Sequence, residues 1–278
     1  MKPSLSVLAT LVLALGPLST LTAQAAPGQP DLGPDLGKEQ RWREQIVDSL
    51  MEGEAVDLQA GDLTFLGIYT ESSGGGDPPK GAAILVHGIG VHPDWPQVIH
   101  PLRVGLPERG WSTLSIQMPV LGNEAQPADY LPLLDGAARR LDAAVDFLRE
   151  RGAGPIVIVA HSLGATMAGD YLGTHPRAVA AYVAIGMSAG TSEARLDNAQ
   201  TVGRIQVPTL DLYGQNDLDA VIGTAAARVK AAVEGGNRGY NQVQVPGADH
   251  FFEGQDEALL DTMTQWLDQT LNRRLIGP

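Results

Sequence analysis

The sequence predicts an α/β fold built on a doubly wound, mostly parallel sheet with an antiparallel pair of strands at its N-terminal side. From residue 82 onward, apolar runs of strand length alternate with longer segments of helical periodicity, as in parallel strands joined by crossover helices. The run Ile156-Val157-Ile158-Val159 shows no polar alternation, which is typical of a strand covered on both faces. Upstream, strand-like runs at residues 56–58 and 63–69 flank a turn at residues 60–62, and we expect them to pair antiparallel.

The remaining elements follow from the same patterns. A helix over residues 39–51 is predicted before the antiparallel pair, and residues 136–151 and 257–271 carry apolar side chains at helical spacing. The connection from residue 187 to 207 has room for little beyond a short helix around residues 193–202, which predicts a minimal cap and an accessible cleft. The predicted parallel strands cover residues 82–86, 112–117, 156–160, 181–185, 209–213 and 241–245.

The N-terminal residues predict export. Lys2 is followed by an apolar stretch and by Ala23-Gln24-Ala25, the pattern of a secretory signal peptide over residues 1–25. Residues 26–38 are rich in Pro and Gly and predict a flexible leader, so a single folded domain is expected over residues 39–278. No later apolar segment is long enough to span a bilayer, and the chain contains no cysteine. We therefore expect a periplasmic or secreted protein with no stable membrane insertion after signal cleavage.

Composition and charge exclude several classes of partner. The 278 residues are 44% hydrophobic, which suits one compact domain, and the formal net charge of −13 would repel nucleic acid. The six histidines show no metal-ligand spacing, and no glycine-rich phosphate-binding motif follows a predicted strand. We expect no metal, no cofactor and no nucleic-acid partner, and nothing in the sequence specifies an oligomeric state.

A candidate nucleophile follows the predicted strand at residues 156–160. The strand leads into a sharp turn of small residues and a helical pattern that starts at Leu163, which would expose Ser162 at the tip of the turn. Such a turn needs small residues two positions before and after the serine, and Ala160 and Gly164 meet that need. The segment resembles the elbow of the α/β-hydrolase superfamily, whose pattern is G-x-S-x-G, and departs from that pattern at Ala160.

The resemblance implies that an acid and then a histidine follow the serine, each just after a later strand. Asp217 follows the predicted strand at residues 209–213, and His250 follows the last predicted strand. We therefore expect His250 to be the base of Ser162 and Asp217 to orient that base, with Asp219 as the reserve acid. Asp211 lies inside a predicted strand and is a weaker candidate.

A glycine-containing loop after an early strand is expected to supply an oxyanion hole, because the tetrahedral intermediate of acyl transfer develops negative charge. The residues His87-Gly88-Ile89-Gly90 resemble the His-Gly motif of the superfamily. The resemblance implies one donor from the backbone N–H of Ile89 or Gly90 and the other from that of Leu163. The candidate substrate-binding residues are His87, Gly88, Gly90, His161 and Met118, with packing as the alternative role for His161 and Met118.

A closer resemblance, carried by residues 87–96 and by Gln117-Met118-Pro119, is to exported bacterial α/β-hydrolase-like proteins without an assigned function. The superfamily resemblance implies a serine hydrolase, and the leading expectation is a carboxylic-ester hydrolase that acts on a small-molecule acyl ester through an acyl-enzyme. Thioesterase and amidase activities use the same triad and stay open. The alternative from another class is a non-catalytic binding or assembly protein of the envelope, since a fold alone does not establish activity.

Overall fold

The computed structural model describes residues 33–74, 76 and 78–275. The predicted signal peptide and most of the predicted leader lie outside the described residues. Within the described part of the chain, no helix has the length and apolar character that crossing a membrane requires.

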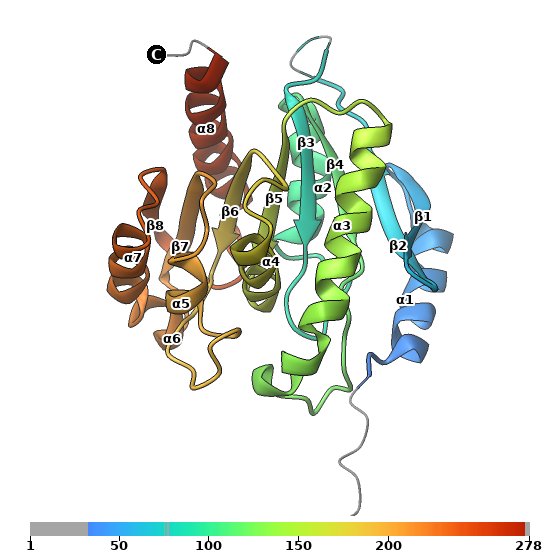
Figure 1. Cartoon of the computed structure of the whole chain (residues 1–278). Helices are drawn as coiled ribbons and strands as arrows, with labels where there is room; N and C mark the ends of the chain where they lie inside the picture. Colours follow the sequence, from blue (N-terminus) through green and yellow to red (C-terminus); the bar gives the residue numbers. More distant parts are fainter. Residues whose placement is uncertain (1–32, 75, 77, 276–278) are drawn as a thin grey trace, which may run out of the picture. The chain divides into compact units, whose positions relative to one another are not determined.

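A single eight-stranded sheet forms the centre of the domain, in the order β1-β2-β4-β3-β5-β6-β7-β8 (Figure 1). β1 pairs antiparallel with β2, and β2 pairs antiparallel with β4, whereas β3 to β8 run parallel to one another. The predicted antiparallel pair and the predicted parallel strands are therefore confirmed. The strands are β1 (Glu54–Ala60), β2 (Leu63–Thr70), β3 (Gly81–Val86), β4 (Trp111–Ile116), β5 (Ile156–His161), β6 (Ala181–Ile185), β7 (Thr209–Asn216) and β8 (Tyr240–Asp249).

Helices cover both faces of the sheet, which explains why β3, β4, β5 and β6 are buried along their whole length. α3 and α4 pack on one face and lie in front of the sheet in Figure 1, while α2 and α8 contribute to the apolar core on the other face. The helices are α1 (Leu36–Ser49), α2 (Ile99–Glu108), the 3-10 helix η1 (Pro127–Leu133), α3 (Leu134–Glu150), α4 (Leu163–Thr174), α5 (Asn198–Val202), α6 (Asp219–Ile222), α7 (Ala225–Glu234) and α8 (Asp256–Leu275).

The N-terminal helix begins earlier than predicted. The sequence places the start of the domain at Glu39, but α1 starts at Leu36, because the side chain of Asp35 accepts a hydrogen bond from the backbone N–H of Lys38 and caps the helix. The Lys38 ammonium also donates to the carbonyl of Leu121 at 3.2 Å and to the side chain of Asn123 at 2.8 Å. The last residues of the predicted leader are thus part of the folded domain.

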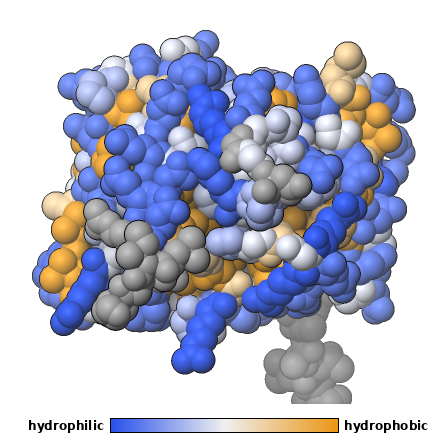
Figure 2. All heavy atoms as spheres, turned by 90° about the horizontal axis from the view of Figure 1, so that it is seen from above, coloured by the Kyte–Doolittle hydropathy of each residue, from blue (hydrophilic) through white to orange (hydrophobic). Residues whose placement is uncertain are grey.

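The cap is as small as predicted. The predicted helix around residues 193–202 is shortened to α5, because the side chain of Asp197 accepts from the backbone N–H of Ala199 and starts the helix there. The carboxyl ends of the parallel strands point downward in Figure 1. Figure 2 views the opposite face, at the amino ends of these strands, and shows a mostly hydrophilic surface.

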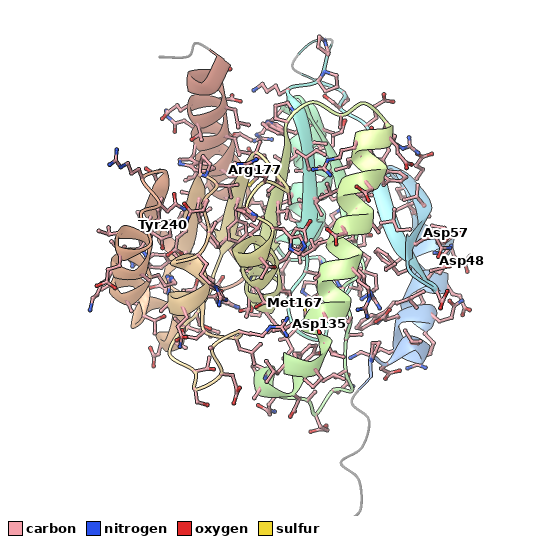
Figure 3. The ribbon with its side chains drawn as sticks, viewed as in Figure 1. Asp48, Asp57, Asp135, Met167, Arg177 and Tyr240 are labelled. Atoms are coloured by element: carbon pink, nitrogen blue, oxygen red, sulfur yellow. The ribbon has the colours of Figure 1, made fainter. Side chains whose placement is uncertain are left out.

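A buried ion pair fixes α7 to the sheet. Arg228 on α7 donates from Nε to Oδ2 of Asp211 on β7 at 2.8 Å, and neither side chain is exposed to solvent. Tyr240, labelled on β8 in Figure 3, donates from its hydroxyl to the same carboxylate at 2.5 Å, as Gln242 does from its amide. Asp211 therefore has a structural role, and it belongs to the strand that leads to Asp217.

We expect Asp211→Asn to lower the free energy of unfolding by about 3 to 5 kcal/mol, because it leaves the Arg228 guanidinium buried without its counter-charge. Urea denaturation followed by circular dichroism measures this difference. Lys230→Ala is the control, because Lys230 pairs with Glu234 on the exposed surface of α7 and its loss should change stability by less than about 0.5 kcal/mol. Equal stability of the two variants would contradict the structural role of Asp211.

Candidate active site

Ser162 occupies the sharp turn between β5 and α4. Its backbone has φ 55° and ψ −123°, a left-handed conformation that a residue other than glycine rarely adopts. This turn requires glycine at position 164, because a Cβ atom there would lie 2.3 Å from the carbonyl oxygen of His87 and would clash with it. Ala160 is buried with its methyl group in the apolar core, so the position where the sequence departs from the G-x-S-x-G pattern accommodates a side chain.

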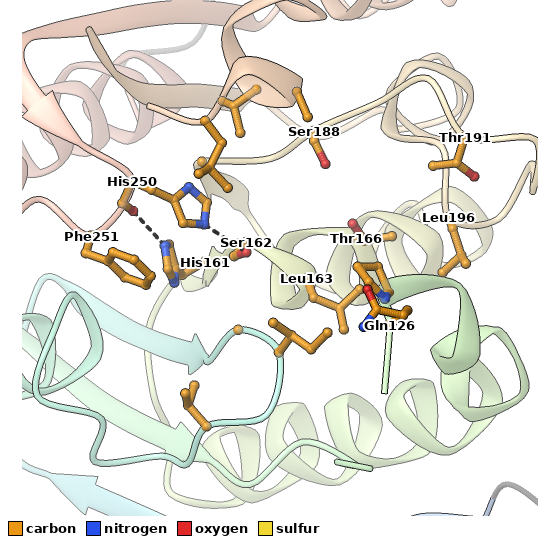
Figure 4. Close-up of a pocket in the computed structure, with 18 of the residues that line it drawn as sticks. Gln126, His161, Ser162, Leu163, Thr166, Ser188, Thr191, Leu196, His250 and Phe251 are labelled. Carbon is orange, nitrogen blue, oxygen red and sulfur yellow. Dashed lines mark hydrogen bonds between the residues drawn. The ribbon is translucent and has the colours of Figure 1, made fainter. Parts of the chain in front are cut away.

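Three side chains from distant parts of the sequence meet at the carboxyl ends of the strands. The Nε2 atom of His250 lies 3.0 Å from the Ser162 hydroxyl, and its Nδ1 atom lies 2.6 Å from Oδ1 of Asp217 (Figure 4). The carboxylate can only accept, so Nδ1 carries the proton and Nε2 is free to accept the proton of Ser162. Asp219, the reserve acid, is exposed at the start of α6.

Asp217 is held in its ionised form. Burial acts to raise its pKa, but the hydrogen bond and charge interaction with His250 oppose burial, as do the backbone N–H groups of Leu218 and Gly214. The net effect is a pKa below the ordinary value of an aspartate. The carboxylate is therefore available near neutral pH to orient the imidazole and to stabilise its protonated form.

Close backbone packing places the loops that carry Asp217 and His250. Gly214 lies so near the end of β8 that a Cβ atom on it would be 2.3 Å from the carbonyl oxygen of Ala248, and the pairing of β7 with β8 shifts register there. Gly186 has φ +60° at the end of β6, and a Cβ atom on it would be 3.0 Å from the ring of His250. The sequence analysis did not single out Gly186. The sequence feature that could have pointed to it is a glycine directly after β6, the strand that pairs with β5.

His161 supports the loop of His250. Its Nε2 atom lies 2.9 Å from the backbone carbonyl of His250, so Nε2 carries the proton and donates, and the two ring centroids are 4.8 Å apart (Figure 4). Burial first, and then the proximity of His250, lowers the pKa of His161 to about 4. His161 is therefore a neutral residue that both packs beneath the histidine loop and lines the cavity.

His87 orients the loop predicted to form the oxyanion hole. It is fully buried, and its Nε2 atom accepts from the backbone N–H of Met118 at 2.9 Å, so its Nδ1–H donates to the carbonyl of Gly88 at 2.9 Å. Desolvation lowers its pKa to about 3, which keeps the ring neutral. Since C=O and N–H of a trans peptide point in opposite directions, this bond turns the N–H of Ile89 away from His87 and toward the cavity that Ile89 lines.

The backbone N–H groups of Ile89 and Gly90, the two candidates for the first oxyanion donor, have different surroundings. The N–H of Gly90 faces the hydroxyl of Tyr130, whose pKa is raised by burial and partly lowered again by the N–H groups of Leu121 and Gly90. In the described part of the chain the N–H groups of Ile89 and Leu163 have no hydrogen-bond partner. The geometry therefore favours Ile89 over Gly90.

A cavity of about 680 Å³ surrounds Ser162 and is mainly apolar. Of the predicted substrate-binding residues, Gly88 and His161 line it, together with Ile89, Ser162, Leu163 and His250. Three other predicted substrate-binding residues do not line this cavity: His87 and Met118 are each 1% exposed, and Gly90 faces a neighbouring cavity on the side of α1. Met118 packs in the apolar core and offers its backbone N–H to His87, so its part is structural.

Among the described residues, no group of three or more His, Asp or Glu side chains is arranged to hold a metal ion.

The fold is that of the α/β hydrolases. The dienelactone hydrolase from Anabaena variabilis superposes with a TM-score of 0.61 at 22% identity, covering 79% of this chain and 98% of that one. Est1E from Butyrivibrio proteoclasticus gives a TM-score of 0.61 at 14% identity, covering 80% and 100%. XC6422 from Xanthomonas campestris, described as an α/β serine hydrolase without lid, gives 0.58 at 19% identity, covering 80% and 95%.

Within this fold class the chain belongs to the DUF3530 family, described as proteins of unknown function, whose model matches residues 4–138 and 135–269. No curated protein matches the sequence. The similarity to solved structures is below 25% identity and defines the architecture, so the chemistry is argued from the site itself.

The buried His161 should make stability depend on pH. Its pKa is about 4 in the folded protein, against about 6.5 in the unfolded chain, so unfolding takes up a proton between these values and the free energy of unfolding falls as the pH falls from 6.5 to 4. His161→Gln keeps an N–H donor for the His250 carbonyl and should reduce this slope by up to about 1.4 kcal/mol per pH unit. Urea denaturation at a series of pH values measures the slope. His175→Gln, at the exposed end of α4, is the control, and an unchanged slope in His161→Gln would contradict the assignment.

Proposed function

We propose that the protein is a serine hydrolase that cleaves carboxylic esters, with Ser162 as nucleophile, His250 as general base and Asp217 as the residue that orients His250. The observation that carries the proposal is the continuous hydrogen-bonded chain from the Ser162 hydroxyl through His250 to Asp217, with distances of 3.0 and 2.6 Å. A serine hydroxyl in contact with an oriented, neutral imidazole is the arrangement that activates it as a nucleophile.

The reaction follows from the positions of these groups. The Ser162 oxygen attacks the ester carbonyl carbon while Nε2 of His250 takes the hydroxyl proton, and the carbonyl oxygen becomes an oxyanion that the N–H groups of Ile89 and Leu163 stabilise. When the carbon–oxygen bond to the alcohol breaks, protonated His250 gives its proton to the leaving oxygen and an acyl-Ser162 ester remains. Water then attacks this ester with His250 again as base, which releases the acid and restores the serine.

The cavity supports an uncharged small-molecule substrate. None of its lining residues is Asp, Glu, Lys or Arg, so no fixed formal charge is present to bind an ionic group. Esters are favoured over amides as the substrate class because an ester carbonyl is more electrophilic than an amide carbonyl and an alkoxide leaves more readily than an amide anion. We further propose that the protein acts in the periplasm or outside the cell, which rests on the signal-like pattern of residues 1–25.

Labelling with a fluorophosphonate tests the activated nucleophile. We expect the wild-type protein to form a stoichiometric adduct at Ser162, located by mass spectrometry of its peptides, and Ser162→Ala to form none. The reagent reacts with serines whose hydroxyl is activated by a neighbouring base, so a binding or assembly protein on this fold would stay unlabelled. Absence of the wild-type adduct would overturn the enzyme proposal.

Single substitutions test the roles of the base and the acid. We expect Asp217→Asn to lower kcat on p-nitrophenyl butyrate by roughly 10³- to 10⁴-fold with little change in KM, because the amide favours the wrong imidazole tautomer. His250→Ala should cost at least as much, and His161→Ala much less. Asp219→Asn is the matched control because its carboxylate is exposed beside the site. A loss confined to Asp219→Asn, or a larger loss in His161→Ala than in His250→Ala, would contradict these assignments.

A further inference from the structure

We propose that Thr166 determines substrate specificity by donating a hydrogen bond to an oxygen atom of the ester. The inference rests on the proposed hydrolase function and names its substrate class: uncharged esters whose apolar chain carries an ether, hydroxyl or carbonyl oxygen a few bonds from the reacting carbonyl. Thr166 lies one helical turn after Ser162 on α4, lines the same cavity and is 5% exposed.

The argument begins with Asn198 on α5, whose amide orientation is fixed by chemistry. Its Nδ2 atom lies 2.6 Å from the backbone carbonyl oxygen of Ser188 and 2.9 Å from the Thr166 hydroxyl. The carbonyl can only accept, so the atom facing it must be the amide nitrogen. Asn198 is 1% exposed and its Oδ1 atom accepts from the Thr201 hydroxyl at 3.3 Å, so the amide is held from both ends.

The second N–H of Asn198 is therefore directed at the oxygen of Thr166. A hydroxyl that accepts one hydrogen bond still has its own proton to donate. A threonine in a helix commonly donates that proton to the carbonyl four residues earlier, as Thr264 does to Leu260 at 2.7 Å in α8. Among the described residues, the Thr166 hydroxyl proton has no acceptor of this or any other kind. Because Thr166 lines the cavity and no protein group accepts its proton, the hydroxyl is free to donate to a molecule that enters, and a substrate oxygen would accept.

The surroundings of Thr166 define what such a substrate looks like. In Figure 4, Thr166, Leu196 and Thr191 lie on one side of Ser162, whereas Phe251 lies on the other. The cavity therefore offers a mixed polar and apolar branch next to α4 and an aromatic side chain near His250. In the absence of any formally charged lining residue, an uncharged oxygen is the acceptor that matches the Thr166 donor.

Matched ester substrates test this directly. We would measure kcat/KM for p-nitrophenyl esters with an all-carbon acyl chain and for analogues in which one methylene, at each of successive positions, is replaced by an ether oxygen. Thr166→Val keeps the side-chain shape and removes the donor. For the best ether ester, we expect the ratio of its kcat/KM to that of the all-carbon ester to fall by roughly three- to tenfold in Thr166→Val, the usual size for one neutral hydrogen bond. Comparing variants on the same pair of esters cancels the electronic effect of the ether oxygen.

Two further variants separate hydrogen bonding from packing. Thr166→Ser retains the hydroxyl and should restore the wild-type ratio, while Thr174→Val, at the exposed end of the same helix, should leave it unchanged. An unchanged ratio in Thr166→Val, or failure of Thr166→Ser to restore it, would overturn the proposal.

The same comparison with alkyl and ether fluorophosphonates, measured as rates of Ser162 labelling, gives the ratio without ester turnover. Labelling of the wild type with an unchanged ratio overturns the role of Thr166 alone. A wild type that is neither labelled nor active on any ester overturns the hydrolase proposal as well.

Discussion

The contact between the start of α4 and the end of β3 is the constraint on which the site depends. Gly164 sits so close to the carbonyl of His87 that only a hydrogen atom fits between them. This contact places the amino end of α4, with the N–H of Leu163, beside the residues that follow β3, and Ser162 has a left-handed conformation in the turn that leads into α4. The proposed nucleophile and the proposed oxyanion donors thus come from one local packing arrangement. The loop after β7 adds Asp217, the proposed acid, and the loop after β8 adds His250, the proposed base.

Most of the scaffold and the three central side chains could be predicted from the sequence because they depend on local patterns. Uninterrupted apolar runs mark strands covered on both faces, and the order of serine, acid and histidine places each residue after a strand end that must lie at one edge of a parallel sheet. Asp217 could be preferred over Asp211 because a residue inside a strand cannot reach that edge. In the structure Asp211 forms an ion pair with Arg228, and Asp217 is the carboxylate that lies beside His250.

The parts that could not be predicted depend on contacts between distant residues. His87 and Met118 follow strands at the expected edge, yet the His87 ring is held by the backbone N–H of Met118 and the Met118 side chain packs in the apolar core, so neither lines the cavity. The helices α2 and η1 are difficult to predict from the sequence for another reason. Each contains a proline, Pro107 in α2 and Pro132 in η1, and proline weakens a helical pattern in sequence. Asn198 and Thr166 are 32 positions apart, and no periodicity links an amide to a hydroxyl across that separation.

The attachment of α1 has a consequence for the wall of the cavity. Trp42 packs edge-on against His92, which packs in the same way against Trp95, a residue of the cavity wall, with ring centroids 5.4 Å apart in each pair. The backbone of Asp35 is bonded to Val120 and Glu39 is paired with the buried Arg140. Removal of Asp35 and α1 would therefore loosen the cavity wall at Trp95, because these contacts hold α1 against that part of the domain.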